Sequence, residues 1–435
     1  MHHFNYCIIL VINYINSSQF VERGIALGTA KKVQKHKEKP NTFKKIVTNE
    51  TVIVVTFLLI ALFLGTLFRL APMNLPGTYD WAEDGIRSQL QSQVAAQVAA
   101  QYPNLPANQR QQFINDQINE QISANEEAYQ QQIEDTAAYF KSQLQDENGQ
   151  TYLLAIDPYL AYSYAKNYLE NGHPGTTITD GQPNMELRNG RLDRFETMRP
   201  HAWAMVQVHK ATSWITGWDL QRTIFFYPVL IIGLAIICAF FVARRIAGNF
   251  AGLVAGTALG LNSALLGRTP AGFSDTDAYI VFFPLLVVWL FAEAIYTKET
   301  WKKFTFIGLS GVATSLFMLF WSNGWHIGSL VVGALGVYFI YLLIKHFKVV
   351  KKHPKKFFFS RPGELILMGM TFLLSAGIMS QLIGWITGLR QGFGNTVGQF
   401  LLGPAGATSI KTVASIDIWP NVLTTVAELN PGSWG

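Results

Sequence analysis

Four acidic residues border apolar segments and could together do chemistry. Asp157 follows an apolar stretch, Asp275 and Asp277 form an Asp-x-Asp pair between two apolar runs, and Glu428 ends the segment Thr-Val-Ala-Glu. A carboxylate at a membrane border is costly unless it is paired, hydrated or bound to a metal, and neighbouring carboxylates repel each other. Mg²⁺ and Mn²⁺ prefer such oxygen ligands. If the four side chains meet, we expect a divalent cation site that neutralises a phosphate leaving group.

Each carboxylate also has an ordinary structural interpretation. Asp157 precedes a proline, a pattern that fits the N-cap of a helix. The Asp-x-Asp pair fits a hydrated turn outside the membrane, and Glu428 fits a simple loop charge. The chemical interpretation therefore depends on whether the fold places all four side chains on the same face.

The composition indicates a membrane protein. The 435 residues are 49% hydrophobic and 14% charged, whereas soluble domains carry about 25% charged residues. The net charge of +6 comes from basic stretches between apolar segments, which is typical of membrane topology and argues against a nucleic-acid partner. Two cysteines exclude a disulfide framework, and the sequence contains no P-loop, dinucleotide fingerprint or zinc-binding spacing.

Seven apolar runs are predicted to span the membrane, so the predicted fold class is an all-α transmembrane helix bundle. The runs are residues 52–68, 223–243, 250–266, 278–296, 304–321, 327–344 and 365–386. Basic residues precede the first run and follow the second, fourth and sixth runs. Because basic flanks stay in the cytoplasm, we expect a cytoplasmic N-terminus and an external location for all four candidate carboxylates.

This topology divides the chain into five parts. They are a basic cytoplasmic tail (1–48), a first transmembrane helix (49–71), a long external loop (72–222), transmembrane helices two to seven (223–386) and a second external loop (387–435). Residues 84–147 are rich in Gln, Asn, Ala and Glu, with apolar positions at helical spacing and breaks at Pro103 and Pro106. We predict two or three soluble helices there, although the composition also fits a disordered spacer.

The order and context of the acidic segments resemble the catalytic subunit of oligosaccharyltransferase in its archaeal, single-subunit form. The matching pieces are Asp-Pro-Tyr from Asp157, Arg-Thr-Pro-Ala-Gly-Phe-Ser-Asp-Thr-Asp over 268–277, and Thr-Val-Ala-Glu over 425–428. Three fragments in the family's order, with basic loops between them, are specific. The resemblance covers residues 50–435 and implies a helix bundle of the C-type glycosyltransferase fold with a long helical first external loop.

The resemblance also implies an activity: transfer of a lipid-linked oligosaccharide from a dolichol-type phosphate or pyrophosphate carrier to Asn in Asn-x-Ser/Thr sequons. Asp157 and Glu428 would be catalytic and hold the acceptor amide, and attack on the anomeric carbon would invert its configuration. The ligands of Mn²⁺ or Mg²⁺ would be Asp157, Asp275, Asp277 and Glu428. Arg268 would contact the donor phosphate, although a snorkelling arginine at a helix end fits it equally well. The protein would act in the cell membrane, with its active face external, on a lipid-linked donor and an acceptor polypeptide.

One departure from the family pattern concerns acceptor recognition. The family carries a soluble C-terminal domain with a Trp-Trp-Asp motif that reads the sequon hydroxyl, and no Trp-Trp-Asp occurs in this sequence. We therefore expect a truncated chain that is inactive or impaired in acceptor recognition. Normal transfer to a sequon peptide by residues 1–435 alone would contradict this expectation. Sequons at Asn16 and Asn49 fall on the predicted cytoplasmic side, so we expect neither to be glycosylated.

Three other functions fit parts of the pattern. Another polyprenol-phosphate-dependent membrane glycosyltransferase, such as a protein O-mannosyltransferase, also carries an acidic residue in its first external loop. An assay with Asn and Ser/Thr acceptors would separate the two activities. A transporter or channel predicts charges at mid-span, whereas the predicted spans hold almost none besides Glu293. The third alternative is a non-catalytic membrane scaffold in which residues 84–147 bind a partner.

Overall fold

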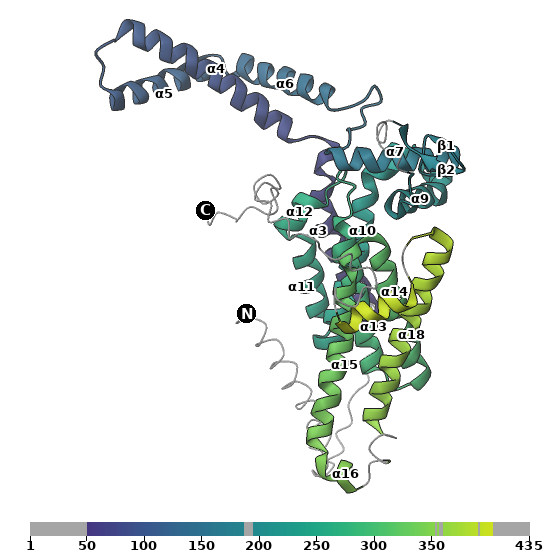
Figure 1. Cartoon of the computed structure of the whole chain (residues 1–435). Helices are drawn as coiled ribbons and strands as arrows, with labels where there is room; N and C mark the ends of the chain where they lie inside the picture. Colours follow the sequence, from purple (N-terminus) through teal and green to yellow (C-terminus); the bar gives the residue numbers. More distant parts are fainter. Residues whose placement is uncertain (1–49, 187–194, 353–354, 356–359, 390–391, 403–435) are drawn as a thin grey trace, which may run out of the picture. The chain divides into compact units, whose positions relative to one another are not determined.

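Six long apolar helices form the core of the described structure (Figure 1). The computed structural model describes residues 50–186, 195–352, 355, 360–389 and 392–402. The helices long and apolar enough to cross a membrane are α3 (Glu50–Leu67), α10 (Leu220–Ala247), α13 (Asp277–Tyr296), α14 (Thr300–Phe320), α15 (Trp325–Lys345) and α18 (Arg361–Thr387). They match six of the seven predicted spans, so the prediction of an all-α, multi-pass membrane protein is confirmed. The predicted basic tail, both sequon asparagines and Glu428 lie outside the described residues.

The third predicted span is not one helix. α11 (Asn249–Gly260) ends after 12 residues, and α12 (Ser263–Arg268) begins at a break where the Asn262 side chain accepts a hydrogen bond from Leu265 N (3.1 Å). A helix of this length is about 18 Å long, shorter than the bilayer core of about 30 Å. The prediction of a continuous helix over 250–266 is wrong because Asn262 caps a new helix inside the apolar run.

The broken segment nevertheless runs along most of α10. Near its start, Gly252 packs against the Phe240 carbonyl. Beyond its end, Gly272 N donates a hydrogen bond to Phe225 O (2.7 Å). The two α10 residues lie about 22 Å apart along the helix. The segment therefore carries the chain from the basic end of α10 toward its other end, which is the crossing that the predicted topology requires.

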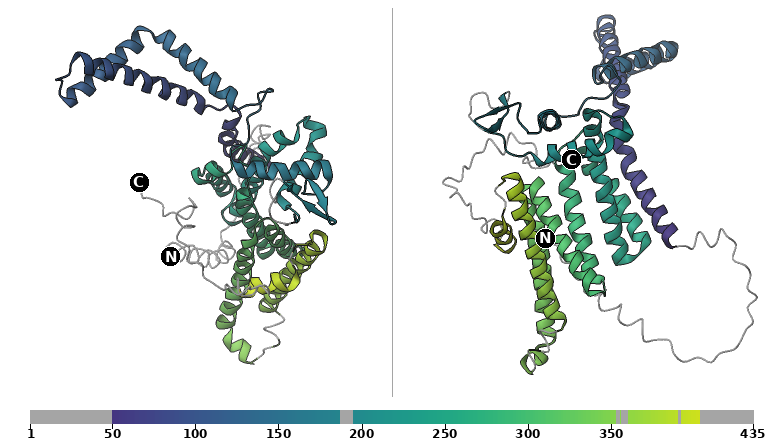
Figure 2. Two further views of the ribbon diagram at one scale, coloured as in Figure 1. Left: turned by 45° about the horizontal axis from the view of Figure 1, so that its top comes forward. Right: turned by 90° about the vertical axis from the view of Figure 1, so that its right-hand side faces the viewer.

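Glycines let α11 approach its neighbours closely. Gly252, Gly256 and Gly260 are the buried residues of this helix, and a Cβ on Gly260 would lie 2.6 Å from the Cα of Gly65 on α3. In a membrane, close backbone packing of this kind is a main source of helix association. Figure 2 shows α3 beside α10 and α11, in the arrangement that these contacts require.

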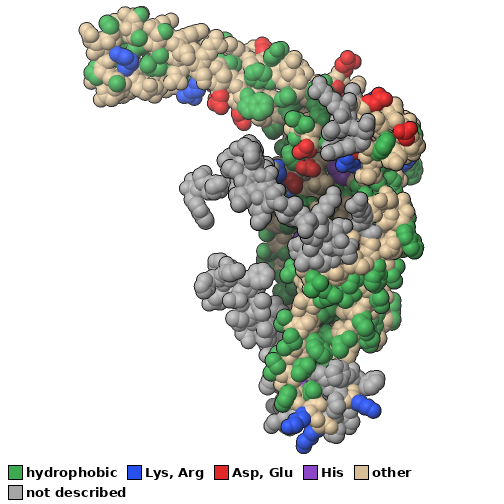
Figure 3. Space-filling model, in the orientation of Figure 1, with side chains coloured by type: hydrophobic (Ala, Val, Ile, Leu, Met, Phe, Trp, Pro, Cys, Tyr) green, Lys and Arg blue, Asp and Glu red, His purple; other side chains and the backbone are tan. Residues whose placement is uncertain are grey.

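Ion pairs join the helices at their basic ends. Arg245 on α10 pairs with Glu293 on α13 (3.4 Å), and Lys303 on α14 pairs with Glu364 on α18. Glu293, the acidic residue within a predicted span, thus has a cationic partner that offsets the cost of its charge. In Figure 3, Lys and Arg side chains gather near α16 (Phe347–Lys352), whereas acidic side chains are visible toward the opposite end of the helices.

Three helices occupy the predicted insertion: α4 (Gly77–Gln101), α5 (Ala107–Ala124) and α6 (Glu126–Gln143). The break between α4 and α5 contains Pro103 and Pro106, as predicted. One apolar cluster joins α5 to the C-terminal part of α4 through Val94, Val98, Ile114 and Ile118. A second cluster joins α6 to the N-terminal part of α4 through Ala82, Ile133 and Ala137. The helical prediction for this segment is confirmed.

The remaining elements flank the core helices. Between α6 and α10 lie α7 (Ile156–Asn171), an antiparallel hairpin of β1 (Thr177–Thr179) and β2 (Gln182–Asn184), and α9 (Pro200–Thr216). α7 and α9 pack against each other and against α10. The short η3 (Ser322–Gly324) joins α14 to α15. After α18, an unpredicted helix, α19 (Phe393–Leu402), packs on α18 and α15 through Phe393 and Phe400.

The packing of α14 on α18 gives a testable pair of substitutions. A Cβ on Gly311 would lie 2.5 Å from Phe372 O and 3.1 Å from Ala376 N, both backbone atoms. Gly311→Ala should therefore separate the helices, and we expect it to lower stability by about 1–3 kcal/mol. At Gly308, the nearest atom would be a Thr371 methyl at 3.8 Å, so Gly308→Ala should be neutral or slightly stabilising. Thermal unfolding of the purified variants in detergent measures both, and equal midpoints would contradict this packing.

Candidate functional site

The loop between α12 and α13 is anchored by backbone hydrogen bonds to three other segments. Ala271 N donates to Arg69 O (2.8 Å), at the end of α3. Gly272 N donates to Phe225 O on α10, and Gly272 O accepts from Leu154 N (3.0 Å), just before α7. Gly272 has φ +90°, and a Cβ there would lie 2.7 Å from the Phe225 ring, so only glycine fits. The loop that carries Asp275 is thus tied directly to the segment that carries Asp157.

Asp275 and Asp277 have different surroundings within this loop. Asp275 is half-buried, and its Oδ1 accepts hydrogen bonds from Thr276 N (2.6 Å) and Thr276 Oγ1 (3.4 Å). Asp277 is the first residue of α13, where a carboxylate is favoured by the helix dipole. It forms an ion pair with Arg268 Nε (3.0 Å), whose guanidinium also lies over the Phe273 ring. Arg268 therefore lies beside the Asp-x-Asp pair and partly neutralises it.

Asp157 lies in the first turn of α7 and is exposed. The N-cap of this helix is Ala155, and no side chain caps it. The interpretation of Asp157 as an N-cap is wrong because the helix starts before it, which leaves its carboxylate outside the capping position. The hydrogen bond between Leu154 and Gly272 lies three residues before Asp157 on one side and three residues before Asp275 on the other. Three residues span at most about 10 Å, so Asp157 and Asp275 each lie within about 10 Å of the residue that makes this hydrogen bond.

The described residues supply only part of the predicted metal site. Among them, no three His, Cys, Asp or Glu side chains are close enough to hold a metal ion. Asp157, Asp275 and Asp277 are nevertheless oxygen donors of the type that Mg²⁺ and Mn²⁺ prefer. Glu428, the fourth predicted ligand, lies outside the described part of the chain. By type these donors fit a divalent cation, but the described structure does not gather Asp157, Asp275 and Asp277 into a metal-binding group, and the four-carboxylate site stays a prediction.

His201, near the start of α9, holds the same loop from another side. Its Nε2 contacts Ser274 O (3.1 Å) and its Nδ1 contacts Tyr279 Oη (3.1 Å). Because a carbonyl can only accept, Nε2 carries the proton and Nδ1 accepts from the Tyr279 hydroxyl. The Tyr279 Oη also lies 2.6 Å from Tyr227 Oη. Burial lowers the pKa of His201 below its usual value, against opposing effects of the Ser274 carbonyl and the Asp275 charge, so the ring is neutral.

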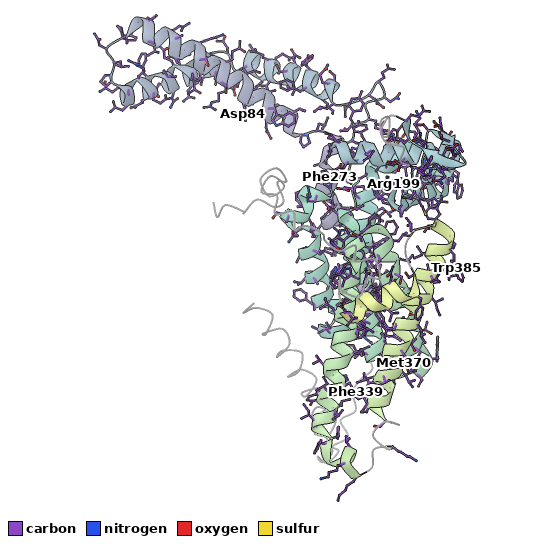
Figure 4. All side chains as sticks on the ribbon, viewed as in Figure 1. Asp84, Arg199, Phe273, Phe339, Met370 and Trp385 are labelled. Atoms are coloured by element: carbon purple, nitrogen blue, oxygen red, sulfur yellow. The ribbon has the colours of Figure 1, made fainter. Side chains whose placement is uncertain are left out.

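A second polar network fixes α7 against α9. The buried Glu196 carboxylate accepts hydrogen bonds from Tyr164 Oη on α7 (2.9 Å) and from Arg199 Nε (3.0 Å). Arg199 N also donates to Tyr168 Oη (2.9 Å). Figure 4 places Arg199 and Phe273 at the same end of the core helices. Our sequence analysis missed both Glu196 and His201, because a single Glu or His outside any motif carries no signal in one sequence.

Comparison with known proteins gives one family. The model of the family described as "Oligosaccharyl transferase STT3, N-terminal" matches residues 131–432. A dolichyl-phosphooligosaccharide-protein glycotransferase of Methanococcus voltae is 30% identical over 309 residues, which cover 66% of this chain and 32% of the relative. Another, of Methanocaldococcus jannaschii, is 35% identical over 173 residues, which cover 37% of this chain and 18% of the relative. The chain thus spans about a third or less of the length of these relatives.

A solved structure is similar to part of the chain. It is the archaeal oligosaccharyltransferase AglB from Archaeoglobus fulgidus in complex with an inhibitory peptide and a dolichol-phosphate. It is 13% identical, with a TM-score of 0.38, and the match covers 54% of this chain and 26% of that protein.

The neutral state of His201 predicts a pH dependence of stability. The unfolded residue titrates near pH 6.5, whereas burial lowers the pKa of the folded residue. Between these two values the unfolded state binds more protons, so the free energy of unfolding falls as the pH falls below about 6.5. We expect the thermal midpoint to drop more between pH 7.5 and pH 5.5 in the wild type than in His201→Gln. Parallel pH profiles for the two proteins would contradict this account.

Proposed function

The chain belongs to the STT3 family of oligosaccharyl transferases, and we propose that it transfers a lipid-linked oligosaccharide to Asn in Asn-x-Ser/Thr sequons. The donor carrier would be a dolichol-type phosphate or pyrophosphate. The observation that carries the proposal is the hydrogen bond from Leu154 N to Gly272 O (3.0 Å). It brings the segment of Asp157 to the Asp-x-Asp loop, which supports a shared site for two of the three motifs of the resemblance.

Asp157 would act on the acceptor amide. An amide nitrogen is a poor nucleophile because its lone pair is delocalised into the carbonyl group. Hydrogen bonds from its two N–H groups to the carboxylates of Asp157 and Glu428 would favour a localised lone pair. The nitrogen would then attack the anomeric carbon as the bond from that carbon to the phosphate oxygen breaks, and the nitrogen would lose a proton to one of these carboxylates. Attack from the face opposite the leaving group inverts the configuration.

All four acidic residues would also act on the donor, through a bound metal ion. Asp157, Asp275, Asp277 and Glu428 would hold Mn²⁺ or Mg²⁺. Such an ion supplies positive charge that stabilises the departing phosphate. Arg268, which pairs with Asp277 at 3.0 Å, adds a second positive charge at the same place. A pyrophosphate that displaces Asp277 from this pair would find a guanidinium suited to phosphate oxygens.

We also propose the placement of the chain in the cell membrane. The site would face the exterior, with the N-terminus and the basic loops in the cytoplasm. Arg244 and Arg245 end α10 at the opposite end from the anchored loop, in agreement with this orientation. The five-part division at residues 48, 71, 222 and 386 is retained as part of the proposal, with α4, α5 and α6 in the first external loop.

A transfer assay with matched variants tests the function. Membranes in which the protein is expressed receive a lipid-linked oligosaccharide, Mn²⁺ and either an Asn-x-Thr peptide or a Thr-only peptide. We expect slow transfer, with glycan on the Asn peptide alone. Asp275→Asn and Asp157→Asn should each lower the rate at least 100-fold, because each removes charge from the site. Glu170→Gln, an exposed acid at the far end of α7, should stay within about twofold of the wild type.

Three outcomes would reject the proposal. Glycan on the Thr-only peptide would favour an O-glycosyltransferase. If activity survives both aspartate substitutions, or if Glu170→Gln lowers it equally, the assigned site is wrong. Full transfer in the presence of EDTA would contradict a role for a divalent cation.

A further inference from the structure

Arg69 is the most deeply buried charged side chain of the described chain, with 0% exposure. It lies in the 3-10 helix η2 (Phe68–Met73), directly after α3. Its Nη1 donates to Gly65 O and to Gly260 O (2.6 Å), and its Nε donates to Thr269 Oγ1 (3.0 Å). One guanidinium thus joins the end of α3, the end of α11 and the beginning of the candidate loop.

Helix ends compensate the charge of this arginine. Gly65 lies in the last turn of α3, and Gly260 is the last residue of α11. The carbonyl groups at a helix C-terminus carry a partial negative charge and favour a nearby cation. Within the described residues, no carboxylate forms an ion pair with Arg69, and its Nη2 is buried without a hydrogen-bond partner. The break of α11 at Gly260 is therefore what creates the second acceptor for this cation.

The contact with Thr269 transmits the position of Arg69 to the loop. Thr269 is fully buried, and its hydroxyl accepts from Arg69 Nε while it donates to Leu265 O (2.5 Å) in α12. The backbone adds a second tie, because Ala271 N donates to Arg69 O (2.8 Å). Asp275 follows four residues later. These two contacts tie the loop directly to the segment that follows α3.

We propose that Arg69 is a positioning residue for the donor-binding loop: it holds Thr269, and through it the segment that presents Asp275 and Asp277. The proposal rests on the proposed function for the identity of the donor. An apolar side chain would fill the same volume with no desolvation cost, so packing alone does not explain a buried guanidinium. A lysine would keep the charge but lacks the planar fork that reaches three acceptors at once.

Thr269 offers the sharper test, because its substitution removes the loop contact and leaves both helix-end contacts of Arg69. The control is Thr257→Val on α11, where the buried hydroxyl has no hydrogen-bond partner within the described structure. Hydrogen exchange is measured by mass spectrometry on the detergent-solubilised protein over residues 269–276. Binding of dolichyl phosphate in the presence of Mn²⁺ is measured on the same samples.

We expect Thr269→Val and Arg69→Lys to speed exchange over 269–276 at least tenfold, with unchanged exchange in α14 and α18. Both should weaken dolichyl phosphate binding about tenfold. Thr269→Ser, which keeps the hydroxyl, should restore both values, and Thr257→Val should match the wild type. Unchanged loop exchange in Thr269→Val, or faster exchange throughout the helices, would overturn the positioning role. If the loop responds as expected but the wild type binds no dolichyl phosphate, the proposed function fails instead.

Discussion

The hydrogen bond from Leu154 N to Gly272 O is the contact on which the candidate site depends. It joins two segments that are far apart in the chain, and each carries an acidic residue three positions later. The bond is possible because Gly272 adopts φ +90° and brings its backbone against Phe225. A side chain at this position would push the loop away from α10 and separate it from the segment that precedes Asp157. The position of the candidate site is thus set by main-chain hydrogen bonds and does not depend on the acidic side chains themselves.

A membrane protein must satisfy every buried backbone group internally, and the loop between α12 and α13 does so through its neighbours. Ala271 donates to η2 and Gly272 donates to α10, and Ser274 O accepts from His201. The Ser274 hydroxyl also donates to Ile224 O on α10. The loop is consequently part of the packed structure at the end of the bundle. This arrangement suits the proposed function, in which the metal ligands would keep their geometry while a lipid carrier enters and leaves.

Several features of this fold follow from local sequence signals, and others do not. Six of the seven apolar runs correctly predicted spanning helices, since composition and length decide membrane insertion. Pro103 and Pro106 marked the break between α4 and α5. The same apolar signal hid the break at Asn262, because a single capping residue hardly changes the hydropathy of a run. The alternative interpretation of Asp157 as a cap, which rested on its proline, is wrong because the helix begins at Ile156. His201 and Arg69 act through contacts with distant segments, which one sequence does not reveal.

The most direct test of the account is a double-mutant cycle for Mn²⁺ binding at Asp157 and Asp275. Mn²⁺ affinity of the purified protein is measured for the wild type, for Asp157→Asn, for Asp275→Asn and for the double variant. If the two carboxylates share one ion, each single change lowers the affinity at least tenfold, and the double variant loses much less than the product of the two effects. Effects that multiply, or a wild type that binds no Mn²⁺, would contradict a shared site.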